Sequence, residues 1–284
     1  MSNIGSMRNV GFELTLDGHM DIGKIKWDSS LNLSHNKNRL TSLLGKDIIS
    51  LNDYHALQVG QEVGAFYLYQ FDGIYQYDGE VPAPQYELGV RAGDVKYHDF
   101  DGNGIINDKD RIIIGSPNPV LSGGWSNTFK YAGFELGVFL TYALGNQVYA
   151  NWMSGPTRLG NYQGLLDEWA KHYWTGPGST NTYPRPIYSL HGQNAQKATN
   201  YLKDGSNIRL SSLTLGYSFP GSLTDRLHIK GLRVYLQGEN MALISRYPGW
   251  DPDVSTSVDP SLIGVDSYGV PRATVYKIGA TVKF

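Results

Sequence analysis

The sequence of 284 residues contains no cysteine, which excludes disulfide scaffolds, thiolate zinc sites and cysteine nucleophiles but leaves the compartment open. An excess of one charge sign is also missing, because 24 lysines and arginines stand against 26 aspartates and glutamates. We therefore expect no nucleic-acid partner and no polybasic membrane patch. No hydrophobic run approaches the roughly 18 to 20 residues that a spanning helix needs. The first residues lack the basic region and apolar core of a signal peptide.

Signatures of catalysis are absent as well. The chain has no G-x-S-x-G, no H-E-x-x-H, no Walker A motif and no dinucleotide fingerprint. Its seven histidines are scattered without the spacing of metal ligands. Carboxylates are plentiful, so a pair at glycosidase spacing stays open. The balance of these observations predicts that the chain is not an enzyme.

What the sequence does contain favours strands and long loops. It has 34 glycines, 20 tyrosines and 12% aromatic residues. Apolar and polar residues alternate with the period of a strand, over segments of about 9 to 14 residues. The segments that show this alternation are 12–17, 26–33, 134–144, 211–219, 232–239 and 275–284.

Two all-β folds fit strands with one apolar face: a soluble β-sandwich and an antiparallel transmembrane β-barrel. Three features favour the barrel. The strands are long, their second faces are polar as in a wet lumen, and short connections alternate with long ones. The short connections are expected near 17–24, 131–134 and 220–230, and the long ones at 39–64, 150–206 and 247–271.

The strand count is predicted to be seven or nine. Two further strands would come from 64–76 and from either 94–100 or 111–115. Both totals are odd, whereas a bacterial barrel made of a single chain normally has an even number of strands. We therefore expect the chain to be a portion of a larger barrel.

Several stretches occur in an order that is specific to one family. They include "VGQEVGAFYLYQFDGIYQ" (59–76), "HDFDGNGIINDKDR" (98–111), "YLKDGSNIRLSSLTLGYSFP" (201–220), "LRVYLQGENMALISRYPGWDPDV" (232–254) and "PRATVYKIGATVKF" (271–284). With these stretches the chain resembles the C-terminal part of the SusC/RagA-like TonB-dependent transporters of the Bacteroidetes outer membrane.

The resemblance implies a barrel of about 22 strands with a plug in its lumen, long extracellular loops, and a location in outer-membrane lipid. Family members import oligosaccharides or peptides with a SusD-like surface lipoprotein, and the TonB complex supplies the energy. Residues 1–284 would be the C-terminal half of the barrel. The plug domain and the N-terminal half, through which the TonB complex is contacted, would be absent. The rival prediction is a soluble, calcium-stabilised β-sandwich that binds carbohydrate.

The stretch 98–111 has the spacing of an EF-hand calcium loop, with glycine at its sixth position. Its flanks read as strands, so we expect a structural Ca²⁺ site instead of a sensor. A loop that folds through Asx turns without metal is the alternative left open. The expected ligands are Asp99, Asp101, Asn103, the backbone carbonyl of Ile105, Asn107 and Asp110.

Aromatic residues in the long connections are candidates for contact with a glycan or with the partner, because exposed rings stack on sugars. The candidates are Trp152, Trp169, Trp174, Tyr183 and Trp250. The alternatives are a self-packed loop hub and, for Trp250, a turn anchor between two prolines. A short amphipathic helix is expected within 165–174.

The last strand ends on an aromatic residue. One face carries Tyr276, Ile278, Ala280, Val282 and the terminal Phe284. Within the resemblance, this pattern is similar to the C-terminal signal read by the outer-membrane assembly machinery. A plain edge strand of a soluble sheet is the alternative.

Overall fold

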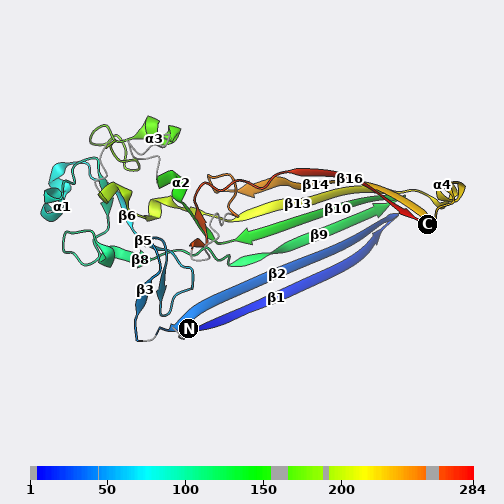
Figure 1. Cartoon of the computed structure of the whole chain (residues 1–284), viewed down its shortest axis with the longest axis horizontal. Helices are drawn as coiled ribbons and strands as arrows, with labels where there is room; N and C mark the ends of the chain where they lie inside the picture. The colour runs from blue at the N-terminus through cyan, green and yellow to red at the C-terminus, as the bar shows by residue number, and fades with distance from the viewer. Residues whose placement is uncertain (1–4, 44, 155–165, 188–191, 254–261) are drawn as a thin grey trace.

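Seven antiparallel strands form one long open sheet (Figure 1). The computed structural model describes residues 5–43, 45–154, 166–187, 192–253 and 262–284. The sheet has the order β1-β2-β9-β10-β13-β14-β16, which leaves β1 and β16 as its edges. Its strands are β1 (Ser6–Ile22), β2 (Ile25–Ser42), β9 (Leu121–Tyr131), β10 (Phe134–Leu144), β13 (Asn207–Ser218), β14 (Gly231–Ser245) and β16 (Val275–Lys283). In the parts of the chain that the structure describes, no helix has the length and apolar character to cross a membrane.

The predicted alternating segments lie in these strands, except that Phe219 and Phe284 each stand one residue past a strand end, and the lower strand count of seven is confirmed. The prediction of two further barrel strands was wrong. Residues 64–76 hold two short strands, β5 (Tyr67–Tyr69) and β6 (Phe71–Ile74), which pair with β8 (Arg111–Ile113) and β7 (Val95–Tyr97) outside the large sheet. The two short strands have different partners, so they do not form one long strand, and the pairing of β6 itself shifts between Phe71 and Gly73.

The connections divide between the two ends of the sheet, as expected (Figure 1). Short connections follow β1, β9 and β13 at one end, the last of them through α4 (Gly221–Thr224) and η6 (Asp225–Leu227). In the β9–β10 turn, Ala132 and Gly133 both have positive φ, as a two-residue hairpin that matches strand twist requires. All long connections lie at the opposite end.

The register of the seven strands keeps side chains of one kind in the same row. One row crosses the whole sheet through Met20, Trp27, Phe129, Leu136, Leu215, Leu236 and Ile278. The next row, on the opposite face, is polar or small: His19, Asp28, Thr128, Gly137, Thr214, Gln237 and Lys277.

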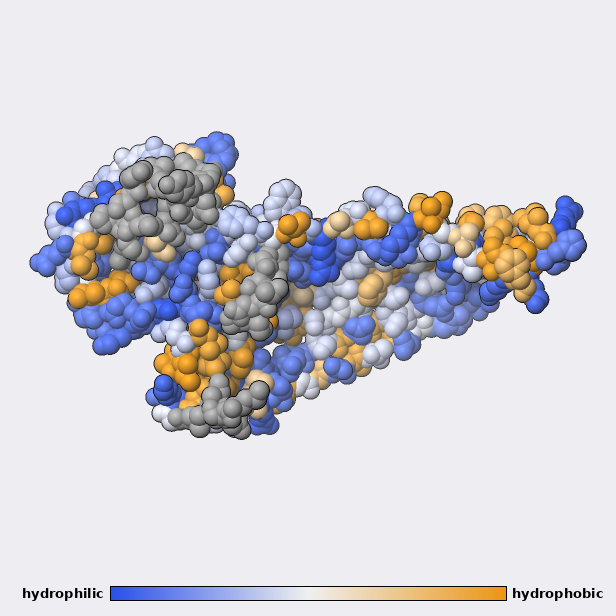
Figure 2. Space-filling view, viewed as in Figure 1, coloured by the Kyte–Doolittle hydropathy of each residue, from blue (hydrophilic) through white to orange (hydrophobic). Residues whose placement is uncertain are grey.

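The apolar face of the sheet is exposed. Leu236 and Ile278 are 53% and 88% exposed, and no described residues pack a second sheet against them. Figure 2 shows apolar side chains gathered near the end of the sheet that carries the short turns. A sandwich would bury this face in its core, so the arrangement is that of a barrel portion.

The buried core lies in the long connections. One cluster joins Phe66, Leu68, Tyr149, Tyr201 and Val265, and a second joins Tyr69, Ile74, Val95, Tyr97 and Ala198. We call the described residues of 45–118, 146–205 and 247–270 the loop layer. Three connections that are distant in sequence therefore pack into one body at the end of the sheet.

Short elements give the loop layer its framework. Its strands besides β5 to β8 are β3 (Ile48–Ser50), β4 (Ala56–Gln58), β11 (Gln147–Ala150), β12 (Leu202–Asp204) and β15 (Val265–Asp266). Its helices are η1 (Asp78–Glu80), α1 (Ala83–Glu87), η2 (Asp108–Asp110), α2 (Asn151–Ser154), α3 (Asp167–His172), η4 (Gly192–Ala195) and η5 (Thr199–Tyr201). Helix α3 is the short helix expected within 165–174, although Leu165 lies outside the described residues.

Candidate functional site

The loop 98–111 brings three carboxylates together. Oxygens of Asp99, Asp101 and Asp110 all lie within 4.8 Å of one another. The two oxygens of Asp99 accept backbone hydrogen bonds from Gly102 and Gly104, each at 2.7 Å. Both glycines have positive φ, which the tight turn of the loop requires. The structure thus gathers three of the six predicted ligands at one point.

The remaining predicted ligands make local bonds within the loop. The side chain of Asn103 accepts a hydrogen bond from Ile105 N at 2.7 Å, and Asn107 Nδ2 donates to the Ile105 carbonyl at 3.2 Å. Asn107 also caps η2 reciprocally with Asp110. The flanking elements are the strands β7 and β8, and η2 lies within the loop, so no pair of long helices is placed for an ion to move.

Hydrogen bonds within the loop favour the ionised form of Asp99. Partial burial raises the pKa of Asp99, but hydrogen bonds from the Gly104 and Gly102 amides outweigh it and leave the pKa below its ordinary value. Asp110 is fully buried and accepts hydrogen bonds from the amides of Phe100 and Asn107. The donors are oxygens only, which is the chemistry that Ca²⁺ prefers.

The five predicted aromatic contacts fall into two groups. Trp169 is only 1% exposed and lies 5.5 Å from the Tyr173 ring. Trp174 bonds through its backbone to Tyr183 and donates its indole N–H to Gln76. These three predicted residues lie within the packing of the loop layer.

Trp152 and Trp250 form the second group, because both line one pocket of about 410 Å³. The turn at 248–249, together with Asp266, Tyr268 and Gly269, completes its wall. Trp250 is 80% exposed, so its ring is not packed between the neighbouring prolines. Asp266 and Tyr268 were not predicted from the sequence, where "VDSYG" carries no motif.

A chain of hydrogen bonds fixes the acidic wall of this pocket. Trp152 Nε1 donates to Tyr247 Oη at 3.0 Å, and Tyr247 Oη donates to Asp266 Oδ2 at 2.6 Å. The Gly269 amide donates to Asp266 Oδ1 at 2.9 Å. Burial and the neighbouring Asp266 raise the pKa of Tyr247 far above its ordinary value, so the hydroxyl remains a donor.

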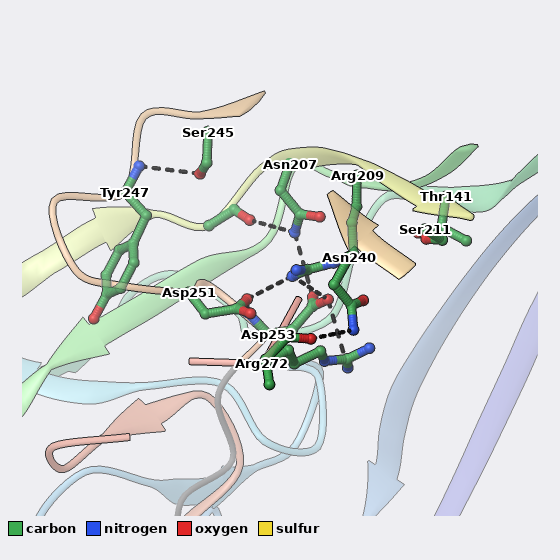
Figure 3. A network of polar contacts seen from close by, with 12 residues as sticks. Thr141, Asn207, Arg209, Ser211, Asn240, Ser245, Tyr247, Asp251, Asp253 and Arg272 are labelled. Carbon is green, nitrogen blue, oxygen red and sulfur yellow. Dashed lines mark hydrogen bonds and ion pairs between the residues drawn. The ribbon is translucent and has the colours of Figure 1, made fainter. Parts of the chain in front are cut away.

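A buried ion-pair network holds the turn that carries Trp250 (Figure 3). Arg209 of β13 is buried and contacts Asp251 at 2.6 Å and Asp253 at 3.1 Å. Asp253 also accepts a hydrogen bond from Asn207 and lies 3.7 Å from Arg272. The connection after β14 is therefore anchored to a strand of the large sheet next to the pocket.

The curated relatives of this chain are all TonB-dependent receptors. No family model matches the chain. It is 28% identical over 304 residues to TonB-dependent receptor P3 and 32% identical over 302 residues to TonB-dependent receptor P26, both of Formosa agariphila. These alignments cover 100% of this chain, and 29% and 30% of the relatives. TonB-dependent receptor SusC of Bacteroides thetaiotaomicron is 28% identical over 302 residues, which cover 99% of this chain and 27% of SusC.

Solved structures show the same fold. The RagAB peptide transporter matches with a TM-score of 0.78 and 24% identity, over 99% of this chain and 30% of that chain. Its 'closed-closed' state matches with a TM-score of 0.77 and 25% identity, also over 99% and 30%. The chain spans about a third or less of the length of the proteins that it matches.

The open sheet with one exposed apolar face and one polar face is a portion of a β-barrel. Over its whole length the chain is homologous to the SusC/RagA-like TonB-dependent receptors. Receptors of this family are outer-membrane proteins, which gives the chain its location. The family is one of transporters, in agreement with the prediction that the chain is not an enzyme.

Replacing Arg209 by methionine is expected to loosen the turn 248–253. The change leaves Asp251 buried without its cation, and losing one partner of a buried pair costs about 3–5 kcal/mol. Urea unfolding in detergent and limited proteolysis of the turn measure the loss. Arg233→Met is the matched control, because its partner Glu135 is half-buried and the pair contributes about 1 kcal/mol or less. Equal losses in the two variants would contradict the assigned role of Arg209.

Proposed function

We propose that residues 1–284 form the C-terminal part of the barrel of a TonB-dependent transporter that imports large nutrients, either oligosaccharides or peptides. The observation that carries the proposal is the apolar row across all seven strands, of which five side chains are exposed and Trp27 and Phe129 are partly buried; this row would face lipid. The homology to TonB-dependent receptors supports it.

The polar face suits a wet lumen. It holds the ion pairs Arg233–Glu135 at 2.7 Å, Lys277–Glu239 at 2.5 Å and Lys130–Asp28 at 3.4 Å. Charges of this kind are costly against hydrocarbon but remain solvated in a water-filled lumen.

An aromatic row lies near the short turns. The register aligns Tyr131, Phe134 and Tyr217, and the first two are more than half exposed on the apolar face. Outer-membrane barrels carry girdles of aromatic residues where lipid meets water. Because such barrels have short periplasmic turns and longer extracellular loops, the short turns would lie on the periplasmic side and the loop layer outside the cell.

The loop layer is the surface that would meet nutrient and partner. A relative of known structure is the RagAB peptide transporter, which supports a peptide as cargo and a SusD-like surface lipoprotein as partner. Oligosaccharides, the other cargo that the resemblance to SusC-like transporters implies, are the alternative. The TonB complex would act through a part of the transporter outside residues 1–284.

Placing an arginine on the apolar face is expected to prevent membrane assembly and to abolish import. Leu236→Arg puts the charge towards lipid, at a cost of about 2–4 kcal/mol near the bilayer midplane. Outer-membrane fractionation and TonB-dependent uptake of labelled oligosaccharides and peptides measure the result.

The matched control for this test is Gln237→Arg, one residue away on the polar face, which should assemble and import normally. The lipid-facing assignment fails if Gln237→Arg is lost from the membrane while Leu236→Arg is retained. Uptake that is unchanged when the gene is deleted or TonB is inactive would overturn the import function.

We also propose that Tyr276, Ile278, Val282 and Phe284 form the C-terminal assembly signal. Phe284 is 85% exposed and follows Ile278 and Val282 on one face of β16. Phe284→Ser is expected to lower the amount of protein in the outer membrane several-fold, while Lys283→Ser on the other face leaves it unchanged. Equal membrane levels in both variants count against the signal.

We propose that the loop 98–111 binds a structural Ca²⁺ ion that stabilises the loop layer. Asp99, Asp101 and Asp110 would hold the ion, and Asn103, Asn107 and the Ile105 carbonyl would complete the ligand set.

Removing Ca²⁺ with a chelator is expected to lower the melting temperature of the loop layer, and Asp101→Asn to remove this Ca²⁺ dependence. Asp101 is exposed, so the variant should fold. Asp108→Asn, whose side chain is 89% exposed and outside the triad, is the control. The absence of binding heat at millimolar Ca²⁺ in calorimetry would leave the metal-free loop as the correct alternative.

A further inference from the structure

The carboxylate of Asp266 is buried without a counter-charge from the residues that the structure describes. Asp266 is 4% exposed, yet it lines the pocket beside Trp152 and Trp250. Among the described residues its hydrogen-bond donors are neutral, the Tyr247 hydroxyl and the Gly269 amide. In the described parts of the chain no lysine, arginine or histidine forms an ion pair with it. A charge removed from water in this way is costly unless it is paired.

Nearby cations have other partners. Arg209 and Arg272 contact the carboxylates of Asp251 and Asp253. Lys197 donates to Asn151 at 3.1 Å and lies 4.9 Å from the centre of the Tyr54 ring. None of these three described cations forms an ion pair with Asp266.

Three aromatic side chains surround this acidic wall. Trp152, Trp250 and Tyr268 line the same pocket, and Tyr268 is 57% exposed. Tyr268 has a φ of 65°, a strained conformation for a residue that is not glycine. The following amide, Gly269 N–H, donates to Asp266 and so fixes the strained turn to the carboxylate. Ring faces attract cations through their quadrupole.

We propose that this pocket binds the cationic side chain of an arginine or lysine in a peptide. Such peptides are one class of cargo in the proposed import function, on which this inference rests. A volume of about 410 Å³ lies in the range of ligand pockets and accommodates one such side chain. The ligand cation supplies the charge that Asp266 lacks, and the rings contact its apolar stem. A neutral sugar ring could stack on the same rings but would leave Asp266 uncompensated, so the cation is the better fit.

The test uses the purified transporter that contains this chain, in detergent. Calorimetry compares two tetrapeptides that are identical except for one arginine, replaced by the neutral isostere citrulline. The arginine peptide is expected to bind at least tenfold more tightly. In Asp266→Asn this difference should vanish, because the variant keeps the shape of the side chain and removes its charge.

A second variant keeps the test valid if Asp266→Asn folds poorly. Trp250→Ala changes a side chain that is 80% exposed, so folding should persist, and affinity for the arginine peptide should fall about tenfold. Controls are Asp167→Asn, an exposed carboxylate that pairs with Lys171, and Tyr77→Ala, an exposed ring outside the pocket. Both controls should bind like the unchanged protein.

Equal affinity for the two peptides would overturn the inference. Tighter binding of a neutral oligosaccharide, lost in Trp250→Ala, would also overturn it and identify a sugar site. Uptake separates the two proposals. TonB-dependent uptake without a preference for arginine would contradict only the pocket assignment. Arginine-selective binding by a protein that mediates no uptake would contradict only the import function.

Discussion

The fixed register between seven antiparallel strands is the constraint on which the rest of the structure depends. A shift of one residue in a single strand would move its whole apolar set to the other face. In the row from Met20 to Ile278 each strand contributes one apolar residue, and the neighbouring row contributes polar or small ones. One face can therefore meet lipid while the other holds the ion pairs Arg233–Glu135, Lys277–Glu239 and Lys130–Asp28.

The loop layer depends on this sheet for its position but has a core of its own. Phe66, Leu68 and Tyr149 are fully buried although they come from connections that are far apart in sequence. Arg209 then joins the layer to β13 through Asp251 and Asp253. The same network holds the turn that presents Trp250, so the geometry of the aromatic pocket is set by an interaction with the barrel.

Much of the fold was predictable because strand alternation is a local property. The segments at 134–144 and 275–284 show their two faces in the sequence alone, and both are strands of the sheet. The error at 64–76 has a physical cause. Leu68 is buried by packing within the loop layer. The sequence does not distinguish an apolar residue in a loop core from an apolar residue that faces lipid. The carboxylates of 98–111 were predictable as a group because the loop is short, whereas its hydrogen bonds required the structure.

By itself, the sequence determined the alternating strands, the division into short and long connections, the acidic loop and the resemblance to TonB-dependent transporters. Only the tertiary structure decided which aromatic residues meet. Trp152 lies beside Asp266 because β11 and β15 pair in parallel, with Ala150 opposite Asp266. That contact joins residues more than a hundred positions apart, so the periodicity of the sequence does not predict it. The pocket is therefore visible only after packing of the loop layer has brought its walls together.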